Sequence, residues 1–375
     1  MSSIVVSLVL NNFKNDSRVL REAHTVAEMG YVVNIVALHE PDLLEYENCE
    51  NYTVHRIKLW SKHWGKSRLV QLFKYIEFLI RVVLQYRKVD IVHSHDLSAL
   101  PVGCAIKFIS RRHVKLVYDS HEYAINDLPY ESKIRQRIKK CIESIFIYWV
   151  DWVITVSDGI ADLYQKTYSL RSRPSVILNC PALVQAPSSN MLKQKLGISK
   201  DTYLFLYQGA LSRGRGIQQF IDGFNKVDNR DLALVFMGYG ELIPLIESQS
   251  TDNIFLMPAV TPSELPYYTA SADCGVALIE DSCLSYRHCL PNKMFEYFMA
   301  GLPVIASDLP EMRKIINDYD TGVLCSSGET SDIEHAIQTI RYIDKDQLAI
   351  NLNRLNTTFN WTNQEKILKR VYETL

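Results

Sequence analysis

Short apolar runs alternate with helical stretches along the first half of the chain. Residues 4–10 have the length of a buried strand, and a helix that Asp16 or Ser17 can cap extends to Met29. Residues 31–38 form a second apolar run, and strand, helix and strand at this spacing predict a βαβ unit of a parallel sheet. The pattern recurs further along the chain. We predict strands at residues 91–94, 115–118, 152–156 and 176–178, and a helix at residues 97–110.

The same alternation restarts after residues 179–190, NCPALVQAPSSN, whose two prolines and lack of periodicity indicate a linker. The predicted strands that follow are residues 203–208, 232–237, 254–257 and 274–279, and the helices are 217–227, 242–248 and 262–271. The tail is helical from Asp332, and residues 361–375 read as a final amphipathic helix. We expect an α/β protein of two doubly wound domains, with the carboxyl ends of both sheets facing a central cleft. The first loop has no glycine-rich fingerprint, so a classical NAD domain is not expected.

Composition and charge narrow the class of protein. Hydrophobic residues make up 47% and charged residues 22% of the 375 residues, as in ordinary globular proteins. A net charge of −1 argues against nonspecific nucleic-acid binding. The eight cysteines form no Cys-x-x-Cys pair, which favours a reducing compartment over a zinc or disulfide framework. The N-terminal apolar run is short and lacks a basic region, and no window reaches about 20 apolar residues, so we expect a cytoplasmic protein.

The strongest chemical signal lies in residues 285–308, SYRHCLPNKMFEYFMAGLPVIASD, which predict a loop, a helix, a turn and a strand. Pro291 suits the first helical turn, and Gly301 can end the helix in a left-handed conformation. Lys293 and Glu296 are three residues apart, so they share one helix face about 4.5 Å apart along the axis. A lysine at a helix start favours phosphate, and a carboxylate one turn later can accept two sugar hydroxyls, which together suit a nucleotide sugar. The alternative is a surface ion pair on a core helix.

A glycine-rich turn with two arginines follows the first strand of the second domain, in the sequence QGALSRGRGI. Its glycines let the backbone approach a ligand, and Arg213 and Arg215 could hold a diphosphate. The alternative is a flexible basic loop.

Two histidine-rich segments follow strands of the first domain, VHSHD at residues 92–96 and DSHEY at residues 119–123. Histidines at strand ends can exchange protons or hydrogen bonds near neutral pH. A metal site could be formed by His93, His95, His121, Asp96, Asp119 and Glu122. We predict no metal, because two separate loops would have to converge, and a satisfied structural histidine is the commoner outcome.

Residues 61–90 and 134–152 combine basic and aromatic side chains. Basic amphipathic helices of this kind can lie on an anionic membrane surface. The alternative is a pair of core-packing helices with solvated charges.

Taken together, these segments resemble the retaining GT-B glycosyltransferases of the large family that includes sucrose synthase and bacterial phosphatidylinositol mannosyltransferases. The resemblance spans nearly the whole chain and is strongest over residues 207–216, 234–240, 254–273 and 290–308. The segment NNFKNDSRVLREAHTVAEMGYVV resembles capsule and O-antigen members, as do ITVSDGI and Asn179-Cys180-Pro181. The resemblance implies two Rossmann-like domains, with residues 1–180 binding the acceptor and residues 181–358 the nucleotide sugar. Residues 359–375 would form a helix that packs back on the first domain.

The resemblance also assigns site residues. In the family's pair of glutamates separated by seven residues, the second matches Glu296, which would bind the donor ribose, and the first falls on His288. The family's phosphate-binding lysine matches Arg215, its usual arginine is Ala210 here, and its catalytic-site histidine matches His121. The implied catalytic residues are His121, Arg215 and Lys293. The implied donor site comprises Gly209, Arg213, Arg215, Gly238, His288, Leu290, Pro291, Lys293 and Glu296. The implied acceptor site comprises Asn11, Asn12, Asp16, Arg18 and His95.

The implied reaction moves a hexose or related sugar, with retention, from a UDP- or GDP-sugar to a glycan or lipid-linked acceptor in cell-surface polysaccharide synthesis, such as capsule or lipopolysaccharide. Arginine, lysine and helix N–H groups would stabilise the leaving diphosphate, so neither a metal nor a further cofactor is required. Contact with the cytoplasmic face of the inner membrane is a further expectation. The alternatives are a non-hydrolysing nucleotide-sugar epimerase and a catalytically inactive GT-B binding module.

Overall fold

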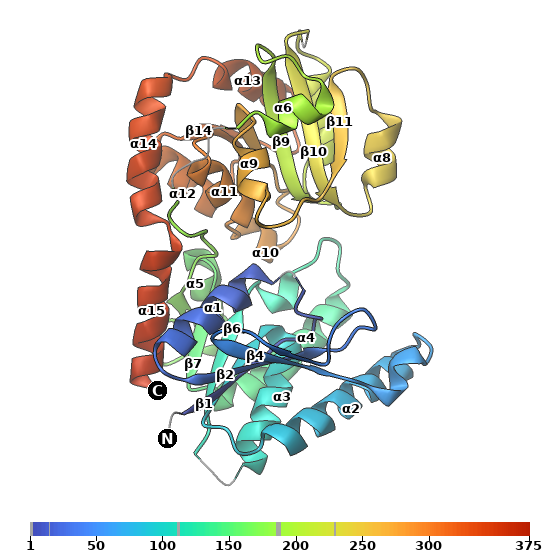
Figure 1. The fold of residues 1–375 in the computed structure, drawn as a ribbon, viewed down its shortest axis with the longest axis vertical. Helices are drawn as coiled ribbons and strands as arrows, with labels where there is room; N and C mark the ends of the chain where they lie inside the picture. Colours follow the sequence, from blue (N-terminus) through green and yellow to red (C-terminus); the bar gives the residue numbers. More distant parts are fainter. Residues whose placement is uncertain (1–2, 15, 111–112, 185–188, 229) are drawn as a thin grey trace. The chain divides into compact units, whose positions relative to one another are not determined.

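The computed structural model describes residues 3–14, 16–110, 113–184, 189–228 and 230–375, which fold into two compact units (Figure 1). The first unit comprises Met1–Asp127, Glu131–Ile177 and Glu365–Leu375, and the second comprises Leu128–Tyr130 and Leu178–Gln364. Part of the predicted linker, residues 185–188, lies outside the described residues.

The first unit is built on a sheet of order β3-β4-β2-β1-β5-β6-β7-β8, parallel except for the pairing of β3 with β4. Strands β1 and β5 at its centre are almost entirely buried, as in a parallel sheet covered on both faces, although β5 carries His93 and His95. The strands are β1 Ile4–Leu8, β2 Val32–Leu38, β3 Tyr46–Asn48, β4 Tyr52–Ile57, β5 Ile91–His95, β6 Lys115–Ser120, β7 Trp152–Thr155 and β8 Ser175–Val176. The helices are α1 Ser17–Glu28, α2 Arg68–Tyr86, α3 Asp96–Ile109, α4 Lys133–Phe146 and α5 Asp158–Tyr168.

The second unit has an all-parallel sheet of order β11-β10-β9-β12-β13-β14. Its strands are β9 Tyr203–Ala210, β10 Leu232–Tyr239, β11 Ile254–Pro258, β12 Cys274–Ala277, β13 Val304–Ser307 and β14 Gly322–Cys325. Its helices are α6 Met191–Leu196, α7 Ile217–Phe224, α8 Ile243–Ser248, α9 Leu265–Thr269, α10 Leu284–Arg287, α11 Asn292–Met299, α12 Pro310–Tyr319, α13 Thr330–Ile340 and α14 Lys345–Thr358.

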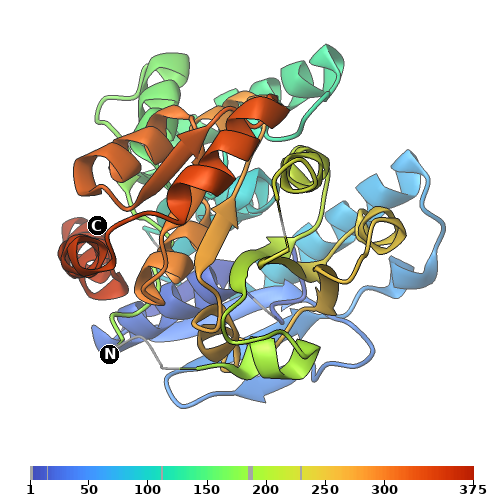
Figure 2. The same ribbon diagram turned by 90° about the horizontal axis from the view of Figure 1, so that it is seen from above.

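The last helix, α15 Trp361–Thr374, is seen nearly end-on in Figure 2. Most of its length belongs to the first unit, where the hydroxyl of Tyr372 lies 2.9 Å from Nδ1 of His93. The ring of Tyr372 also packs edge-on against Tyr31, with centroids 5.5 Å apart. Tyr372 is buried, so these contacts fix the C-terminal end of the chain on the first sheet.

The α/β prediction with two doubly wound sheets is confirmed, and the differences are local. The antiparallel edge strand β3 has only three residues, two of them exposed, so no apolar alternation marks it. Pro291 is the N-cap of α11 rather than a residue of its first turn, since its ψ of 138° is extended. Helix α9 spans Leu265–Thr269, which is shorter than the predicted 262–271.

Candidate active site

Helix α11 holds a carboxylate in a fixed position beside the end of β9. Its apolar face, including Met294, Phe295 and Phe298, is buried. One carboxylate oxygen of Glu296 accepts a hydrogen bond of 2.6 Å from Nε2 of Gln208, at the end of β9. The Oε1 atom of Gln208 in turn accepts from Thr269 Oγ1 at 2.8 Å. Glu296 is therefore oriented from the sheet, which a freely rotating surface residue would not be.

Lys293 lies one turn earlier on α11 with an ammonium group that has no anionic hydrogen-bond partner. Its Nζ atom is buried, donates no hydrogen bond to the described residues, and sits 3.4 Å from the centroid of the Tyr207 ring. Burial, followed by the charge of Arg215, lowers the pKa of Lys293 well below its usual value, although Glu296 acts in the opposite direction. A buried cation of this kind is costly unless an anion joins it.

The glycine-rich loop between β9 and α7 brings a second cation to the same place. Gly209, Gly214 and Gly216 all have positive φ, at 105°, 77° and 61°, which side chains with a Cβ rarely adopt. The guanidinium of Arg215 stacks on the Tyr286 ring at 4.6 Å, and its Nε atom is buried without a hydrogen-bond partner among the described residues. The loop thus presents Arg215 to the space that Lys293 also faces.

Arg213 points elsewhere. Its side chain is 81% exposed and its Nε atom lies 3.9 Å from the carboxylate of Glu241. Gly238 pairs with Gly209 across β9 and β10, and a Cβ at Gly238 would come within 1.8 Å of the Gly209 carbonyl oxygen. Gly238 therefore lies beside the loop, whereas the Arg213 side chain is directed at Glu241.

The connection between α10 and α11 contains the remaining predicted donor residues, His288, Leu290 and Pro291. His288 is the C-cap of α10, and its backbone N–H donates to the Leu284 carbonyl at 3.2 Å. The connection leads directly into the N-terminus of α11, one turn before Glu296.

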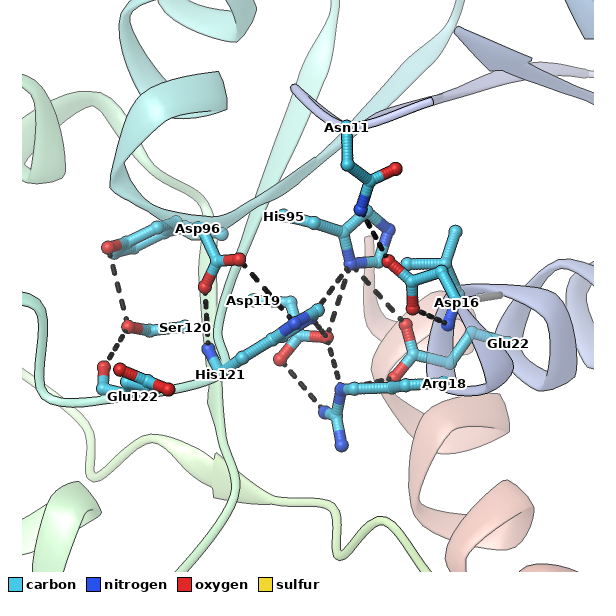
Figure 3. A network of polar contacts seen from close by, with 12 residues as sticks. Asn11, Asp16, Arg18, Glu22, His95, Asp96, Asp119, Ser120, His121 and Glu122 are labelled. Atoms are coloured by element: carbon cyan, nitrogen blue, oxygen red, sulfur yellow. Dashed lines mark hydrogen bonds and ion pairs between the residues drawn. The ribbon is translucent and has the colours of Figure 1, made fainter. Parts of the chain in front are cut away.

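In the first unit, a polar network joins the ends of β5 and β6 to α1 (Figure 3). The Arg18 guanidinium donates to both oxygens of Asp119 at 2.8 and 2.9 Å and to the Ile177 carbonyl at 2.7 Å. Burial opposes ionisation of Asp119, but the charge of Arg18 holds its pKa well below the usual range. Arg18, which we expected to contact the acceptor, is instead buried and fixes Asp119.

His121 occupies the exposed side of this network. Its Nε2 atom lies 3.2 Å from Asp119 Oδ2 and 3.2 Å from Nδ1 of His95. Its backbone N–H donates to Asp96 Oδ1 at 3.2 Å, and its Nδ1 lies 3.6 Å from Asp96 Oδ2. Burial lowers the pKa of His121, but Asp96 and Asp119 outweigh it and raise the pKa to about 9. Of the predicted histidines, His121 is the most accessible in this network.

The other predicted residues of the first unit divide into loop-forming and buried groups. Asn11 donates to Asp16 at 2.9 Å, Asp16 caps α1 by accepting from the Val19 N–H, and Asn12 accepts from the Lys14 N–H. His95 is buried in β5, so it does not lie beyond the strand end.

His93 is likewise buried inside β5, with Nδ1 2.9 Å from the Tyr372 hydroxyl. The two histidine segments do converge, contrary to the argument made against a metal site. Sequence reasoning missed Glu22, whose signal was its position four residues after Arg18 on the same helix face.

Known proteins match both units. The family model "Glycosyltransferase Family 4" matches residues 17–181, and "Glycosyl transferases group 1" matches residues 202–341. A chitobiosyldiphosphodolichol beta-mannosyltransferase from Debaryomyces hansenii is 21% identical over 95% of this chain and 85% of its own length. An uncharacterized 41.2 kDa protein in the cps region of Klebsiella pneumoniae is 21% identical over 68% of this chain and 71% of its own.

Solved structures share the fold. Sucrose-phosphate synthase from Thermosynechococcus elongatus has a TM-score of 0.82 at 16% identity, covering 99% of this chain and 98% of its own. Anabaena HepE in complex with UDP-glucose has a TM-score of 0.78 at 16% identity, covering 99% and 100%. The two family models follow one another along the chain and together span most of it, and the folds agree over nearly the full length. The chain therefore belongs to glycosyltransferase family 4 and is a retaining glycosyltransferase of the GT-B fold.

Proposed function

We propose that the protein transfers a hexose or related sugar from a UDP- or GDP-sugar, and that the second unit binds this donor. The observation that carries the proposal is the buried, unpaired ammonium of Lys293 beside Arg215, with Glu296 anchored one turn further along α11. Two basic groups that form no hydrogen bond with a carboxylate of the described residues suit a diphosphate, and a fixed carboxylate suits ribose hydroxyls. Gly209 and Gly238 keep the neighbouring strand ends free of side chains, and the connection through His288, Leu290 and Pro291 would face the donor sugar.

In the proposed reaction the bond between the anomeric carbon and the diphosphate breaks, and the acceptor hydroxyl adds from the same face. Its proton passes to the departing phosphate oxygen, so no protein nucleophile takes part. Arg215 and Lys293 stabilise the charge on the diphosphate as it leaves, in the role that a divalent ion has in other transferases. His121 is proposed to position the donor sugar or the acceptor through its accessible edge.

We further propose a glycan or lipid-linked acceptor in cell-surface polysaccharide synthesis, such as capsule or lipopolysaccharide, approached through the loop of Asn11, Asn12 and Asp16. Two relatives support this class of acceptor. One is named for a lipid-linked oligosaccharide substrate, and the other comes from a cps region.

A cytoplasmic location at the inner membrane face belongs to the same proposal. Among the described residues, no helix combines the length and the apolarity that crossing a membrane requires. Helix α2 nevertheless exposes an apolar stripe, with Leu69 81% and Leu84 61% accessible, and its only acidic residue, Glu77, is paired with Arg81. An apolar stripe on a basic helix favours an anionic lipid surface. Flotation with phosphatidylglycerol vesicles at low salt tests this, and protein that stays at the bottom of the gradient contradicts it.

The donor assignment is tested by thermal shift with UDP, GDP, CMP, ADP and dTDP, without added metal and then with it. A ligand that binds only the folded state raises the melting temperature, so one nucleoside diphosphate should stand out. Glu296→Ala should abolish that shift and the transfer of sugar, whereas Glu247→Ala, at an exposed residue of α8, should change neither. Equal shifts in wild type and Glu296→Ala would refute the role of α11. Donor turnover without acceptor would indicate an epimerase, and binding without turnover an inactive module.

A further inference from the structure

Four buried side chains with metal-binding groups meet in the first unit, and the space between their ligand atoms is called the pocket below. The side chains are Glu22 of α1, His93 and His95 of β5, and Asp119 of β6, and each is at most 2% exposed. One ligand atom from each lies within 4.8 Å of the others. His93 and His95 share one face of β5, and His95 pairs with Asp119 on the neighbouring strand β6. Glu22, on helix α1, contacts both histidines from the side of that face.

The hydrogen bonds around this pocket orient the histidines so that one nitrogen of each faces inward. His95 Nε2 lies 2.8 Å from the Ser7 hydroxyl, and His93 Nδ1 lies 2.9 Å from the Tyr372 hydroxyl. The inner nitrogens, His95 Nδ1 and His93 Nε2, are therefore directed at the carboxylates. Metal-binding histidines are usually held in this way by a hydrogen bond to the outer nitrogen.

Several inward atoms lack the hydrogen bonds that buried polar atoms normally make. Among the described residues, neither carboxylate oxygen of Glu22 nor His93 Nε2 has a hydrogen-bond partner. Native proteins leave few such atoms, because each costs free energy of desolvation. Arg18 Nε lies 3.1 Å from Glu22 Oε1 as an ion pair, but it gives its hydrogen bond to Asp119, so the Glu22 oxygens are left without one among the described residues.

The distances fit a small ion. His95 Nδ1 lies 3.4 Å from Asp119 Oδ2, and His93 Nε2 lies 3.8 Å from Glu22 Oε2 and 4.0 Å from Asp119 Oδ2. Four nitrogen and oxygen ligands around tetrahedral zinc are about 3.4 Å apart. His95 Nδ1 lies 3.9 Å from Glu22 Oε2, and all four ligand atoms lie within 4.8 Å of one another, so binding would require them to draw closer together.

Charge sets a limit on the affinity and on the kind of ion. Arg18 Nε lies 2.8 Å from Asp119 and 3.1 Å from Glu22, so two carboxylates already share one guanidinium. The two imidazoles favour zinc over magnesium or calcium, which prefer oxygen ligands. We propose that Glu22, His93, His95 and Asp119 bind one zinc ion that fixes α1 and, through His93 and Tyr372, α15 to the sheet. His95 and Asp119 also contact His121, each at 3.2 Å, so the ion would lie next to that histidine, but the proposal does not rest on the proposed transfer reaction.

The proposal is tested on full-length protein without a polyhistidine tag, produced in zinc-supplemented medium. We expect about one zinc per chain by mass spectrometry. Because all four side chains are buried, the ion would enter during folding. Protein refolded with zinc should therefore melt several degrees higher than protein refolded with a chelator, and refolding with cobalt should give the visible absorption of tetrahedral Co²⁺.

Two variants and one control identify the ligands. Glu22→Gln and His93→Gln should each lose the zinc and the dependence of the melting temperature on it. His55→Gln should keep both, because His55 is equally a buried histidine, bonded to Tyr86 Oη at 2.7 Å, but lies outside the pocket.

Two results would overturn the proposal. The first result is wild-type protein that contains no metal after refolding with zinc, together with a Glu22→Gln variant as stable as wild type. This result would mean that Glu22 is protonated and that no ion is needed between the four side chains. The second is undiminished zinc in both pocket variants, which would place the ion elsewhere.

Discussion

Replacing Lys293 with methionine separates two effects of the buried amine: its effect on the stability of the unliganded protein and its effect on the affinity for an anionic ligand. Methionine keeps most of the side-chain volume and removes the ammonium that lies 3.4 Å from the Tyr207 ring. An unsatisfied buried polar group costs about 1–3 kcal/mol. The cation–π contact that would be lost contributes up to about 2 kcal/mol. These terms oppose one another, so the stability of the unliganded protein should fall by no more than about 1 kcal/mol and could rise by up to about 3 kcal/mol.

Binding should respond very differently. A hydrogen bond between a charged amine and a phosphate contributes about 1.5–3 kcal/mol, so Lys293→Met should weaken the nucleoside diphosphate that binds by about 10- to 150-fold. Isothermal titration calorimetry measures the affinity, and urea denaturation without ligand measures the stability. Arg213→Met is the matched control, because it removes the same charge from an exposed side chain near the same site. An unchanged affinity in Lys293→Met, or an equal loss in Arg213→Met, would refute the assignment.

Three further predictions follow from the same contacts. Burial and a neighbouring guanidinium depress the pKa of Lys293, so binding of a phosphate group should be accompanied by uptake of a proton. The affinity of the wild type should therefore fall as the pH rises through that depressed pKa, whereas the affinity of Lys293→Met should not change with pH in this range. Calorimetry in several buffers measures both the affinity and the proton uptake. Gly238→Ala should separate the ends of β9 and β10 and remove the ligand-induced thermal shift, whereas Gly65→Ala, where no atom lies within 4 Å, should leave it. Glu143 accepts from three tyrosine hydroxyls, two of them on fully buried rings, so Glu143→Gln should cost about 2–3 kcal/mol in urea denaturation. An unchanged denaturation midpoint would contradict that network.

The sequence predicted features that depend on nearby residues. The spacing of Lys293 and Glu296 placed both on α11, and the glycines of the loop after β9 were recognised by the conformations they permit. The contact that orients Glu296 comes from Gln208, 88 residues away, which was predicted as the last residue of a strand without any role at the site. No local pattern encodes such a pairing, because it depends on the order of strands in the sheet.

The same limit explains why Arg18 and Lys293 could not be told apart in advance. Both are cations at the start of a helix, and both were expected to bind a ligand. Arg18 is compensated by Asp119, 101 residues later, and by Glu22, so its charge is used within the fold. Lys293 has Tyr207 and Arg215 as neighbours, and the carboxylate of Glu296 offsets only part of the effect of burial and of Arg215 on its pKa. A buried cation with its own carboxylate stabilises structure, whereas one without it favours an anionic ligand, so the assignment of the donor site rests on the partners rather than on the lysine itself.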